Sequence, residues 1–219
     1  MSRLLFEKTG KAIWISHLDL MRLFQRAFKR AGLSLTHTQG FNPRPSVSIA
    51  MPLSVGVESI CELLDFDLDG DAVACDEILT RLNQSLVEGI RVLKVYENGR
   101  KIRDLSLLHC QVTLEYDKGI PKNTKVALQE MFAKESLIVP KKSKNGVQDQ
   151  DIIPMIKQLE VLEAGECELV LDCVVCCQNP TLNPIQLVVA IELYLPELKP
   201  DFAKCRRIEI FDSDGNVFR

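Results

Sequence analysis

The sequence contains no apolar run that approaches the roughly 18 residues needed for a membrane-spanning helix. Its opening segment, MSRLLFEKTGKAI, also lacks the layout of a signal peptide, because charged side chains interrupt the apolar stretch. Phosphate-loop, dinucleotide-binding and serine-hydrolase motifs are absent from the sequence. We therefore expect a cytoplasmic protein with no membrane contact and no cofactor. In a reducing cytosol its eight cysteines are expected to be free thiols.

The composition is that of an ordinary globular protein, with 46% hydrophobic and 26% charged residues. A length of 219 residues predicts one large domain or two small ones, each able to bury its own core. The segment ENGRKIRDL, residues 97–105, is a charged connector. We place a domain boundary there, which predicts an N-terminal domain over residues 1–104 and a C-terminal domain over residues 105–219.

Hydrophobic periodicity predicts the elements of the first domain. Residues 2–15 are typical of a strand pair, or of one bent strand, around a turn at Gly10. A helix then runs from Ser16 to Gly32. Further elements follow in the order strand, strand, helix and strand, at residues 47–51, 58–69, 72–86 and 90–96. The order β-α-β-β-α-β predicts a ferredoxin-like fold, with an antiparallel sheet and both helices on one face.

The second domain has a similar succession of predicted elements. Strands are expected in the C-terminal tail and at residues 108–116, 136–140, 159–164 and 168–177. Helices are expected at residues 121–134 and 184–192, the latter with Asn183 as N-cap. One or two helical turns are expected over residues 151–158, and Asn145-Gly146 predicts a β-turn. The predicted fold class is therefore α+β, with two ferredoxin-like domains in tandem.

The helix predicted from Ser16 to Gly32 has two opposed faces. Ser16 is the expected N-cap, and Asp19 places a negative charge in the first turn, where the helix dipole favours it. One face is apolar, because hydrophobic residues recur at three- and four-residue spacing. The opposite face carries the cations Arg22, Arg26, Lys29 and Arg30. A charged outer face of a helix is as often simply exposed to solvent as it is involved in binding, so both interpretations stay open at this point.

The sign of the local charge favours a binding role for this helix. Residues 1–48 carry eight basic and two acidic side chains, a net charge of +6, whereas the whole chain carries −3. The remaining residues therefore carry −9. A charge asymmetry of this kind indicates which class of partner the protein binds. We expect an anionic partner such as RNA. Because the rest of the chain is acidic, any contact with RNA is expected to be local.

The segment GFNPRP predicts a stiff loop after the helix. Pro43 and Pro45 fix their own φ angles and favour extended geometry in the residues before them. The loop is therefore expected to hold Phe41, Asn42 and Arg44 in defined directions. Because aromatic side chains are usually buried, the pattern favours Phe41 as part of the core. The alternative is that Phe41 stacks on a base, with Arg44 on a phosphate and Asn42 on a base or sugar edge.

Three segments, ISHLDLMRLFQRAFKRAGL, GFNPRPSVSIAMPLSVGVES and LNQSLVEGIRV, resemble a bacterial family of radical SAM-linked proteins. The resemblance covers most of the chain and is most specific in its N-terminal half. The family's domain occurs alone or fused to a radical SAM enzyme with a cobalamin-binding-type region. Its members are often encoded beside an E/G-type ribonuclease and ribosomal protein genes, which implies RNA- or ribosome-linked work. The resemblance carries over no catalytic residue.

Three functional hypotheses follow. The chain has no C-x3-C-x2-C run, so the resemblance implies the partner of a radical SAM enzyme rather than the enzyme. The first hypothesis is a non-catalytic accessory protein that binds RNA, or presents a substrate, through Arg22, Arg26, Lys29, Arg30, Phe41, Asn42 and Arg44. The second is an RNA-processing or RNA-modifying enzyme with His17 as general base and Asp19 nearby, although a partly buried structural histidine is the favoured interpretation. The third is a protein-interaction module that docks an acidic partner.

Candidate metal ligands are few. Cys173, Cys176 and Cys177 form a single C-x2-C-C, whereas a zinc site normally needs paired C-x2-C units. On a strand Cys176 faces away from the other two, so plain burial is favoured over a metal site. The alternating carboxylates of residues 65–71 favour a solvated turn, with a Mg²⁺ site as the alternative. We therefore predict no metal.

Overall fold

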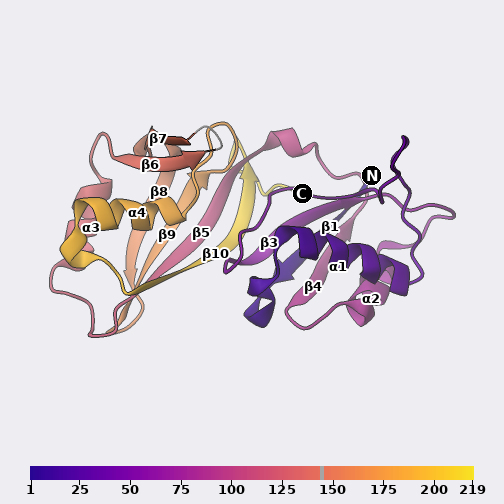
Figure 1. Cartoon of the computed structure of the whole chain (residues 1–219), viewed down its shortest axis with the longest axis horizontal. Helices are drawn as coiled ribbons and strands as arrows, with labels where there is room; N and C mark the ends of the chain where they lie inside the picture. Colours follow the sequence, from indigo (N-terminus) through magenta and orange to yellow (C-terminus); the bar gives the residue numbers. More distant parts are fainter. Residues whose placement is uncertain (144–145) are drawn as a thin grey trace. The chain divides into compact units, whose positions relative to one another are not determined.

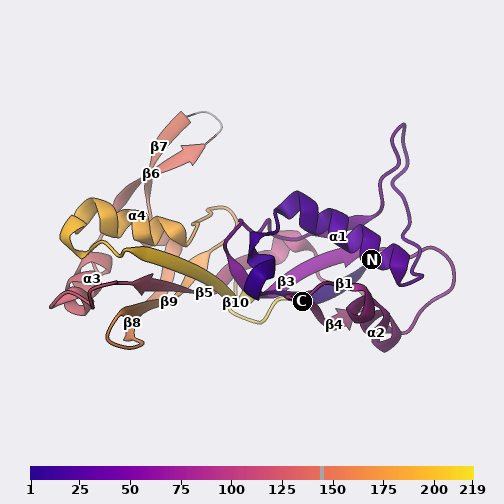
Figure 2. The same cartoon turned by 60° about the horizontal axis from the view of Figure 1, so that its bottom comes forward.

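The computed structural model describes residues 1–143 and 146–219, and the chain divides into two compact units (Figures 1 and 2). The first unit comprises Met1–Asp104 together with Phe218–Arg219, and the second comprises Leu105–Val217. The last two residues thus belong to the first unit, whereas the sequence pattern placed them in the second. Phe218 is fully buried, which explains the difference. Within the described residues, no helix is both long and apolar enough to cross a membrane.

The first unit consists of an antiparallel sheet and two main helices. Its elements are, in chain order, β1 (Ser2–Lys8), the 3-10 helix η1 (Gly10–Trp14), α1 (His17–Arg30), β2 (Val47–Ile49), β3 (Glu58–Phe66), α2 (Cys75–Ser85), β4 (Ile90–Tyr96) and the 3-10 helix η2 (Ile102–Asp104). The strands lie in the order β4-β1-β3-β2, and each neighbouring pair is antiparallel. Apart from η1 and η2, this is the succession of elements that hydrophobic periodicity predicts.

Both helices pack on the same face of this sheet. Strand alternation places Leu4 and Phe6 of β1 on that face, and they share one hydrophobic cluster with apolar residues of α1 and α2. The Phe6 and Phe24 rings meet edge to face, with centroids 4.7 Å apart. The buried side chains of α1 have three- and four-residue spacing: Leu20, Phe24, Ala27 and Phe28. Burial of this face directs the charged face of α1 to solvent.

The segment after β1 differs from the prediction of a second strand. Residues Gly10–Trp14 form a 3-10 helix, in which the Ala12 amide donates to the Thr9 carbonyl at 3.1 Å. The short apolar run AIWI resembles a strand, but in this segment Ala12 alone is buried and Trp14 is 65% exposed. Gly10 has a positive φ of 55°, which turns the chain out of β1.

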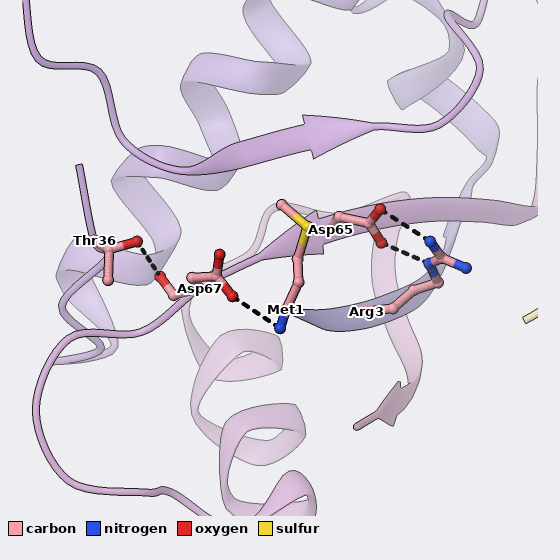
Figure 3. Close-up of polar contacts among 5 residues, drawn as sticks. All are labelled: Met1, Arg3, Thr36, Asp65 and Asp67. Carbon is pink, nitrogen blue, oxygen red and sulfur yellow. Dashed lines mark hydrogen bonds and ion pairs between the residues drawn. The ribbon is translucent and has the colours of Figure 1, made fainter. Parts of the chain in front are cut away.

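The other face of the sheet holds a buried ion pair against the last residues of the chain. Arg3 of β1 and Asp65 of β3 are neighbours in the antiparallel register, and Arg3 Nε lies 2.5 Å from Asp65 Oδ1 (Figure 3). The Phe218 ring centroid lies 5.3 Å from the Arg3 guanidinium carbon and 5.1 Å from that of Arg100. The Arg100 amide donates to the Arg219 carbonyl at 3.1 Å. These contacts hold the chain end in the first unit.

The second unit has the same succession of elements with one insertion. In chain order it contains β5 (Leu105–Glu115), α3 (Thr124–Phe132), β6 (Ile138–Ser143), β7 (Gly146–Asp151), η3 (Ile153–Met155), β8 (Ile156–Glu163), β9 (Glu168–Cys176), α4 (Ile185–Tyr194), η4 (Pro196–Leu198) and β10 (Phe202–Asp212). The strands lie in the order β10-β5-β9-β8 and pair antiparallel, while β6 and β7 form a separate hairpin. The fold class is thus α+β with antiparallel sheets.

The sheet of the second unit has a buried and a partly exposed face. Alternate residues of β5 and β9 are buried, Cys110 and Cys173 among them. The partly exposed side chains between them are polar in the middle of the sheet: His109 Nε2 lies 2.9 Å from Asp172 Oδ1, and Gln111 donates to Asp172 Oδ2 at 2.8 Å. In both views α3 and α4 lie beside this sheet (Figures 1 and 2).

Several boundaries of the second unit differ from the sequence prediction. The strand expected at residues 136–140 is β6, which begins at Ile138. The helical turns expected over residues 151–158 are reduced to η3, because β7 extends to Asp151 and β8 begins at Ile156. The last helix starts one residue late, with Pro184 as N-cap, although Asn183 Oδ1 still accepts from the Ile185 amide at 3.2 Å. The turn predicted at Asn145-Gly146 lies partly outside the described residues.

Candidate nucleic-acid interface

The N-terminus of α1 has the cap that the sequence predicts. Ser16 is the N-cap, and its Oγ accepts from the Asp19 amide at 3.2 Å and donates to Asp19 Oδ2 at 2.7 Å. Arg22 Nη1 donates to Asp19 Oδ1 at 3.0 Å. These contacts, that of Ser16 first and that of Arg22 second, lower the pKa of Asp19. Asp19 is therefore an anion engaged in capping the helix.

Four exposed cations occupy the solvent-facing side of α1: Arg22, Arg26, Lys29 and Arg30. They are not equivalent. Arg30 Nη2 donates to the carbonyl of Ser85, the last residue of α2, at 2.6 Å, and this bond directs the side chain toward α2. By contrast, Arg26 and Lys29 form no hydrogen bond or ion pair with the residues that the structure describes. These two side chains are therefore the cations of α1 that are most available to an anionic ligand.

The chain between α1 and β2 forms a projecting loop over residues 34–46. Three hydrogen bonds join its two arms: the Thr38 amide donates to the Arg44 carbonyl at 2.8 Å, the Arg44 amide donates to Thr38 Oγ1 at 3.0 Å, and the Ser46 amide donates to the Thr36 carbonyl at 2.8 Å. Figure 2 shows this segment extending away from the sheet of the first unit. The paired arms hold the residues between Thr38 and Arg44 as a braced tip.

The base of the projecting loop is attached to the chain that follows β3 (Figure 3). The Thr36 amide and hydroxyl both donate to the Asp67 carbonyl, at 3.0 and 3.5 Å. The Asp69 amide donates to the Ser34 carbonyl at 2.8 Å. Asp67 Oδ1 in turn lies 3.1 Å from the terminal ammonium of Met1. The loop thus leaves the fold from a fixed base, and the Asp67 carboxylate pairs with an ammonium group.

Phe41 lies at the tip with its side chain fully exposed, at 104% of its reference area. The prediction that Phe41 belongs to the core is therefore wrong. The physical reason is the pairing of the loop arms, which carries the tip away from the hydrophobic cluster under α1. Asn42 and Arg44 are exposed as well. A braced, fully exposed aromatic side chain that is followed by two exposed polar ones is available to a ligand.

A pocket of about 360 Å³ lies between the last turns of α1 and the base of the projecting loop. Gln25 and Lys29 of α1 line it on one side. Ser34, His37 and Pro45 line it from the loop, where His37 and Pro45 face each other as an isolated antiparallel bridge. The pocket therefore joins the cationic face of α1 to the arms that support the tip.

The structure brings together part of the predicted site. Lys29 lines the pocket with the loop, and Arg22 and Arg26 occupy the preceding turns of the same helix face. Arg30 is directed to α2, and Phe41, Asn42 and Arg44 lie at or beside the loop tip. The sequence pattern indicates no binding role for three of the pocket residues: Gln25, Ser34 and His37. The predicted end of the helix at Gly32 could have indicated these residues, because a chain that reverses its direction there passes beside the last helical turn.

The sequence matches a family described as uncharacterized proteins conserved in bacteria (DUF2344), over residues 2–184. The chain belongs to this family. The matched range includes α1, the projecting loop and the pocket of this DUF2344 protein. The family description names neither an activity nor a partner. No curated protein matches the chain.

A comparison with solved structures found several matches to this DUF2344 chain, two of which follow. One is titled "Crystal Structure of a Cbf5-Nop10-Gar1 Complex", with a TM-score of 0.54 and 10% identity over 97% of this chain and 50% of the other. The DUF2344 chain thus spans about half the length of that solved chain. The other is an unknown protein from Galdieria sulphuraria, with a TM-score of 0.27 and 13% identity over 94% of this chain and 96% of the other. At 10% identity, the likeness to the first concerns the fold alone.

The residues considered for catalysis form no acid–base pair with each other. His17 is the first residue of α1 and is partly buried. Its Nδ1 is buried and has no hydrogen-bond partner among the described residues. The Asp19 carboxylate is bonded to Ser16 and Arg22 instead of to the imidazole. A general base must lie within hydrogen-bond reach of the proton that it removes, so Nδ1 has no such access in this conformation, and a base at this position would have to act through Nε2.

The cysteines considered as metal ligands lie on β9 and just beyond it. Cys173 is buried and its Sγ lies 3.4 Å from that of Cys110, its direct neighbour on β5. Cys176 is also buried, and burial raises the pKa of Cys177 to about 12. In the part of the chain that the structure describes, no group of three or more His, Cys, Asp or Glu side chains is placed to hold a metal ion.

Proposed function

We propose that this DUF2344 protein binds single-stranded RNA through the projecting loop and the cationic face of α1, as a non-catalytic accessory protein of a radical SAM enzyme. The observation that carries the proposal is the ring of Phe41, fully exposed at the tip of a loop whose arms are hydrogen-bonded to each other. Single exposed apolar side chains are ordinary on protein surfaces, and Trp14 is another in this chain. The support therefore comes from the combination of a fully exposed ring, a braced loop and exposed cations nearby.

A base of RNA is the ligand that best matches an isolated exposed ring. Stacking of a base on an aromatic side chain contributes about 1–3 kcal/mol, and every base has a flat face to offer. The bonds between Thr38 and Arg44 restrict the loop before binding, so less conformational entropy is lost when the complex forms. Bases in a duplex are stacked on each other, which favours a single strand as the partner.

The charges around the loop match the RNA backbone. Arg26 and Lys29 are exposed on α1, and Arg44 is exposed beside the tip. Arginine and lysine side chains bind phosphates regardless of the RNA sequence, whereas stacking on the aromatic ring requires an unpaired base. Residues 1–48 carry +6 in a chain of −3, so the RNA contact is confined to this region.

We also propose that each unit is a ferredoxin-like domain. In the first unit the strand order is β4-β1-β3-β2, and in the second it is β10-β5-β9-β8. In both orders the first strand of the unit lies between its last and its third, with the second strand at the edge. Together with the order strand, helix, strand, strand, helix, strand, this supports the assignment. The fold alone does not fix the function.

The proposed radical SAM partner rests on the resemblance of three sequence segments to radical SAM-linked proteins. The role of a partner, rather than of the enzyme, is supported by the lack of a C-x3-C-x2-C run in the sequence. Affinity purification of the chain from its native cell extract, with and without nuclease, tests this part. Recovery of a radical SAM enzyme in both conditions supports a direct protein partner, and its absence from both contradicts that partner but leaves RNA binding intact.

Fluorescence anisotropy with a labelled single-stranded RNA of roughly ten nucleotides tests the RNA-binding proposal directly. We expect Phe41→Ala to weaken binding by about 1–3 kcal/mol and Phe41→Tyr to retain most of it, because tyrosine keeps the stacking surface. Removal of Arg26 and Lys29 together should lower the dependence of log K on log salt by about 0.7 for each phosphate that the variant no longer neutralises. Arg81→Ala is the matched control, since Arg81 is a helix cation on α2 that pairs with Glu77.

Equal affinity for the wild type, Phe41→Ala and the Arg26→Ala/Lys29→Ala double variant contradicts the proposal. Binding of an acidic protein instead of RNA, abolished by reversal of these charges and insensitive to nuclease, favours an interaction module. RNA cleavage or modification that disappears in His17→Ala favours an enzyme.

A further inference from the structure

The pocket beside α1 has two walls of different origin. Gln25 and Lys29 of α1 form one wall, and the inner arm of the projecting loop forms the other, with Ser34, His37 and Pro45. Its volume of about 360 Å³ lies at the small end of the range for ligand sites, about 300–1,000 Å³. This volume suits one nucleotide or a molecule of similar size.

The apolar part of the pocket lining is fixed before any ligand binds. Leu33 and Leu35 line the pocket, and they are only 3% and 9% exposed. The Leu33 amide donates to the Phe28 carbonyl at 3.0 Å, while Leu35 forms an antiparallel bridge with Leu68. Because both apolar residues are held by backbone contacts, the pocket is preformed, and binding requires little ordering of the protein.

We infer that this pocket binds one nucleobase of the RNA together with its phosphate. This inference rests on the proposed function and names a subsite within it, separate from the Phe41 tip. Pro45, which is partly exposed, offers apolar surface to the face of a flat base. Gln25 carries an amide that both donates and accepts, and Ser34 carries a hydroxyl that does the same, so the two can pair with a base edge. Lys29 supplies a cation for the phosphate.

Lys29 lies in the last turn of α1, next to the pocket, where its ammonium group offsets the partial negative charge at the C-terminal end of the helix. A phosphate without a base would make the Lys29 contact but none of the contacts with Gln25, Ser34 or Pro45. Phosphate alone is accordingly a poor ligand for this pocket.

NMR titration of the whole ¹⁵N-labelled chain with AMP, GMP, CMP and UMP tests the inference, with ribose 5-phosphate and inorganic phosphate as probes that lack a base. We expect saturable shifts of the amides of residues 32–37 and of the Gln25 side-chain amide with at least one mononucleotide, and none with the two control probes. Gln25→Ala should weaken binding about 2- to 12-fold, the effect of removing one hydrogen bond. Ser34→Phe should abolish it by filling the pocket, while Arg81→Ala should leave it unchanged.

Absence of saturable shifts with all four mononucleotides overturns the inference. If the RNA oligonucleotide still binds in the anisotropy assay, the proposed function stands and only the subsite falls. Binding that is equally strong in Gln25→Ala and in a Ser34→Phe variant with wild-type thermal unfolding also overturns it. Mononucleotide binding by a chain that does not bind the oligonucleotide supports the pocket and contradicts the proposed function, so the two failures are distinguishable.

Discussion

Arg3 binds Asp65 through two parallel hydrogen bonds, from Nε at 2.5 Å and from Nη2 at 2.9 Å, across the central strands of the first unit. The Arg3 side chain is 2% exposed, and its third nitrogen, Nη1, is buried without a hydrogen-bond partner among the described residues. A cation so removed from water depends on its single carboxylate partner, because an unpaired buried charge is strongly unfavourable. The pair is thus a point at which the first unit is vulnerable.

Asp65→Ala should destabilise the first unit by about 3–5 kcal/mol, because it leaves Arg3 buried and unpaired. Urea unfolding followed by fluorescence of Trp14, the one tryptophan of the chain, measures the loss. Asp67→Ala is the control, since its ion pair with Met1 is largely exposed and should change stability by only about 0–1 kcal/mol. Equal effects of the two substitutions would show that burial of Arg3 does not matter.

Phe218→Ala should destabilise the first unit by about 3–5 kcal/mol, the usual range for deletion of a buried phenylalanine side chain. Phe218 is fully buried against Arg3, whereas its neighbour Val217 is 50% exposed. Val217→Ala should therefore stay within about 0.5 kcal/mol of the wild type. The same urea titration compares the two variants, and a small effect of Phe218→Ala would contradict the assignment of the chain end to the first unit.

Ser16→Ala should destabilise the protein by about 1 kcal/mol, the typical effect of removing an N-cap side chain. The substitution should also raise the pKa of Asp19 toward its ordinary value, because the Ser16 hydrogen bond is the largest cause of its depression. A carboxyl with a depressed folded pKa adds stability above its unfolded pKa of 3.8 and loses it as the pH falls through the folded value. NMR titration of the Asp19 carboxyl in both proteins checks the shift. An unchanged pKa would refute it.

Tyr116 should ionise late, because burial, aided by the charge of Asp201, raises its pKa to about 12. Its hydroxyl donates to the Leu198 carbonyl at 3.0 Å. Between the ordinary value of 10.0 and about 12, the unfolded state loses this proton while the folded state keeps it, so the free energy of unfolding falls as the pH rises. Absorbance titration of the tyrosines should lose its latest step in Tyr116→Phe and keep it in Tyr194→Phe.

Thr38→Val should weaken RNA binding about two- to tenfold, the effect expected for removal of one hydrogen bond, with little change in global stability. The substitution removes the acceptor of the Arg44 amide at 3.0 Å and so loosens the tip that carries Phe41. Thr80→Val on α2 removes a comparable exposed bond, that to the Asp76 carbonyl, and serves as control. Anisotropy with the single-stranded RNA measures both, and equal affinities would argue against a role for loop rigidity.

Local patterns were sufficient to predict most of the elements. The cap at Ser16 and the apolar face of α1 follow from short-range spacing, which side chains one turn apart enforce whatever the rest of the chain does. The 3-10 helix at Gly10–Trp14 shows the limit, since a run of four apolar residues fits a strand and a short helix equally well. Propensity alone does not choose between them, and contacts with the neighbouring elements decide.

Composition and nearest-neighbour spacing are local properties, and they are enough to establish the charge asymmetry, the two-faced helix and the presence of a stiffened loop. Tertiary structure alone decided that Phe41 is exposed, that Arg30 binds Ser85 and that Lys29 shares a pocket with the loop. These outcomes depend on where chain segments far apart in sequence meet, as Arg30 and Ser85 do across 55 positions. Such meetings are set by the packing of the whole core, which no short pattern encodes.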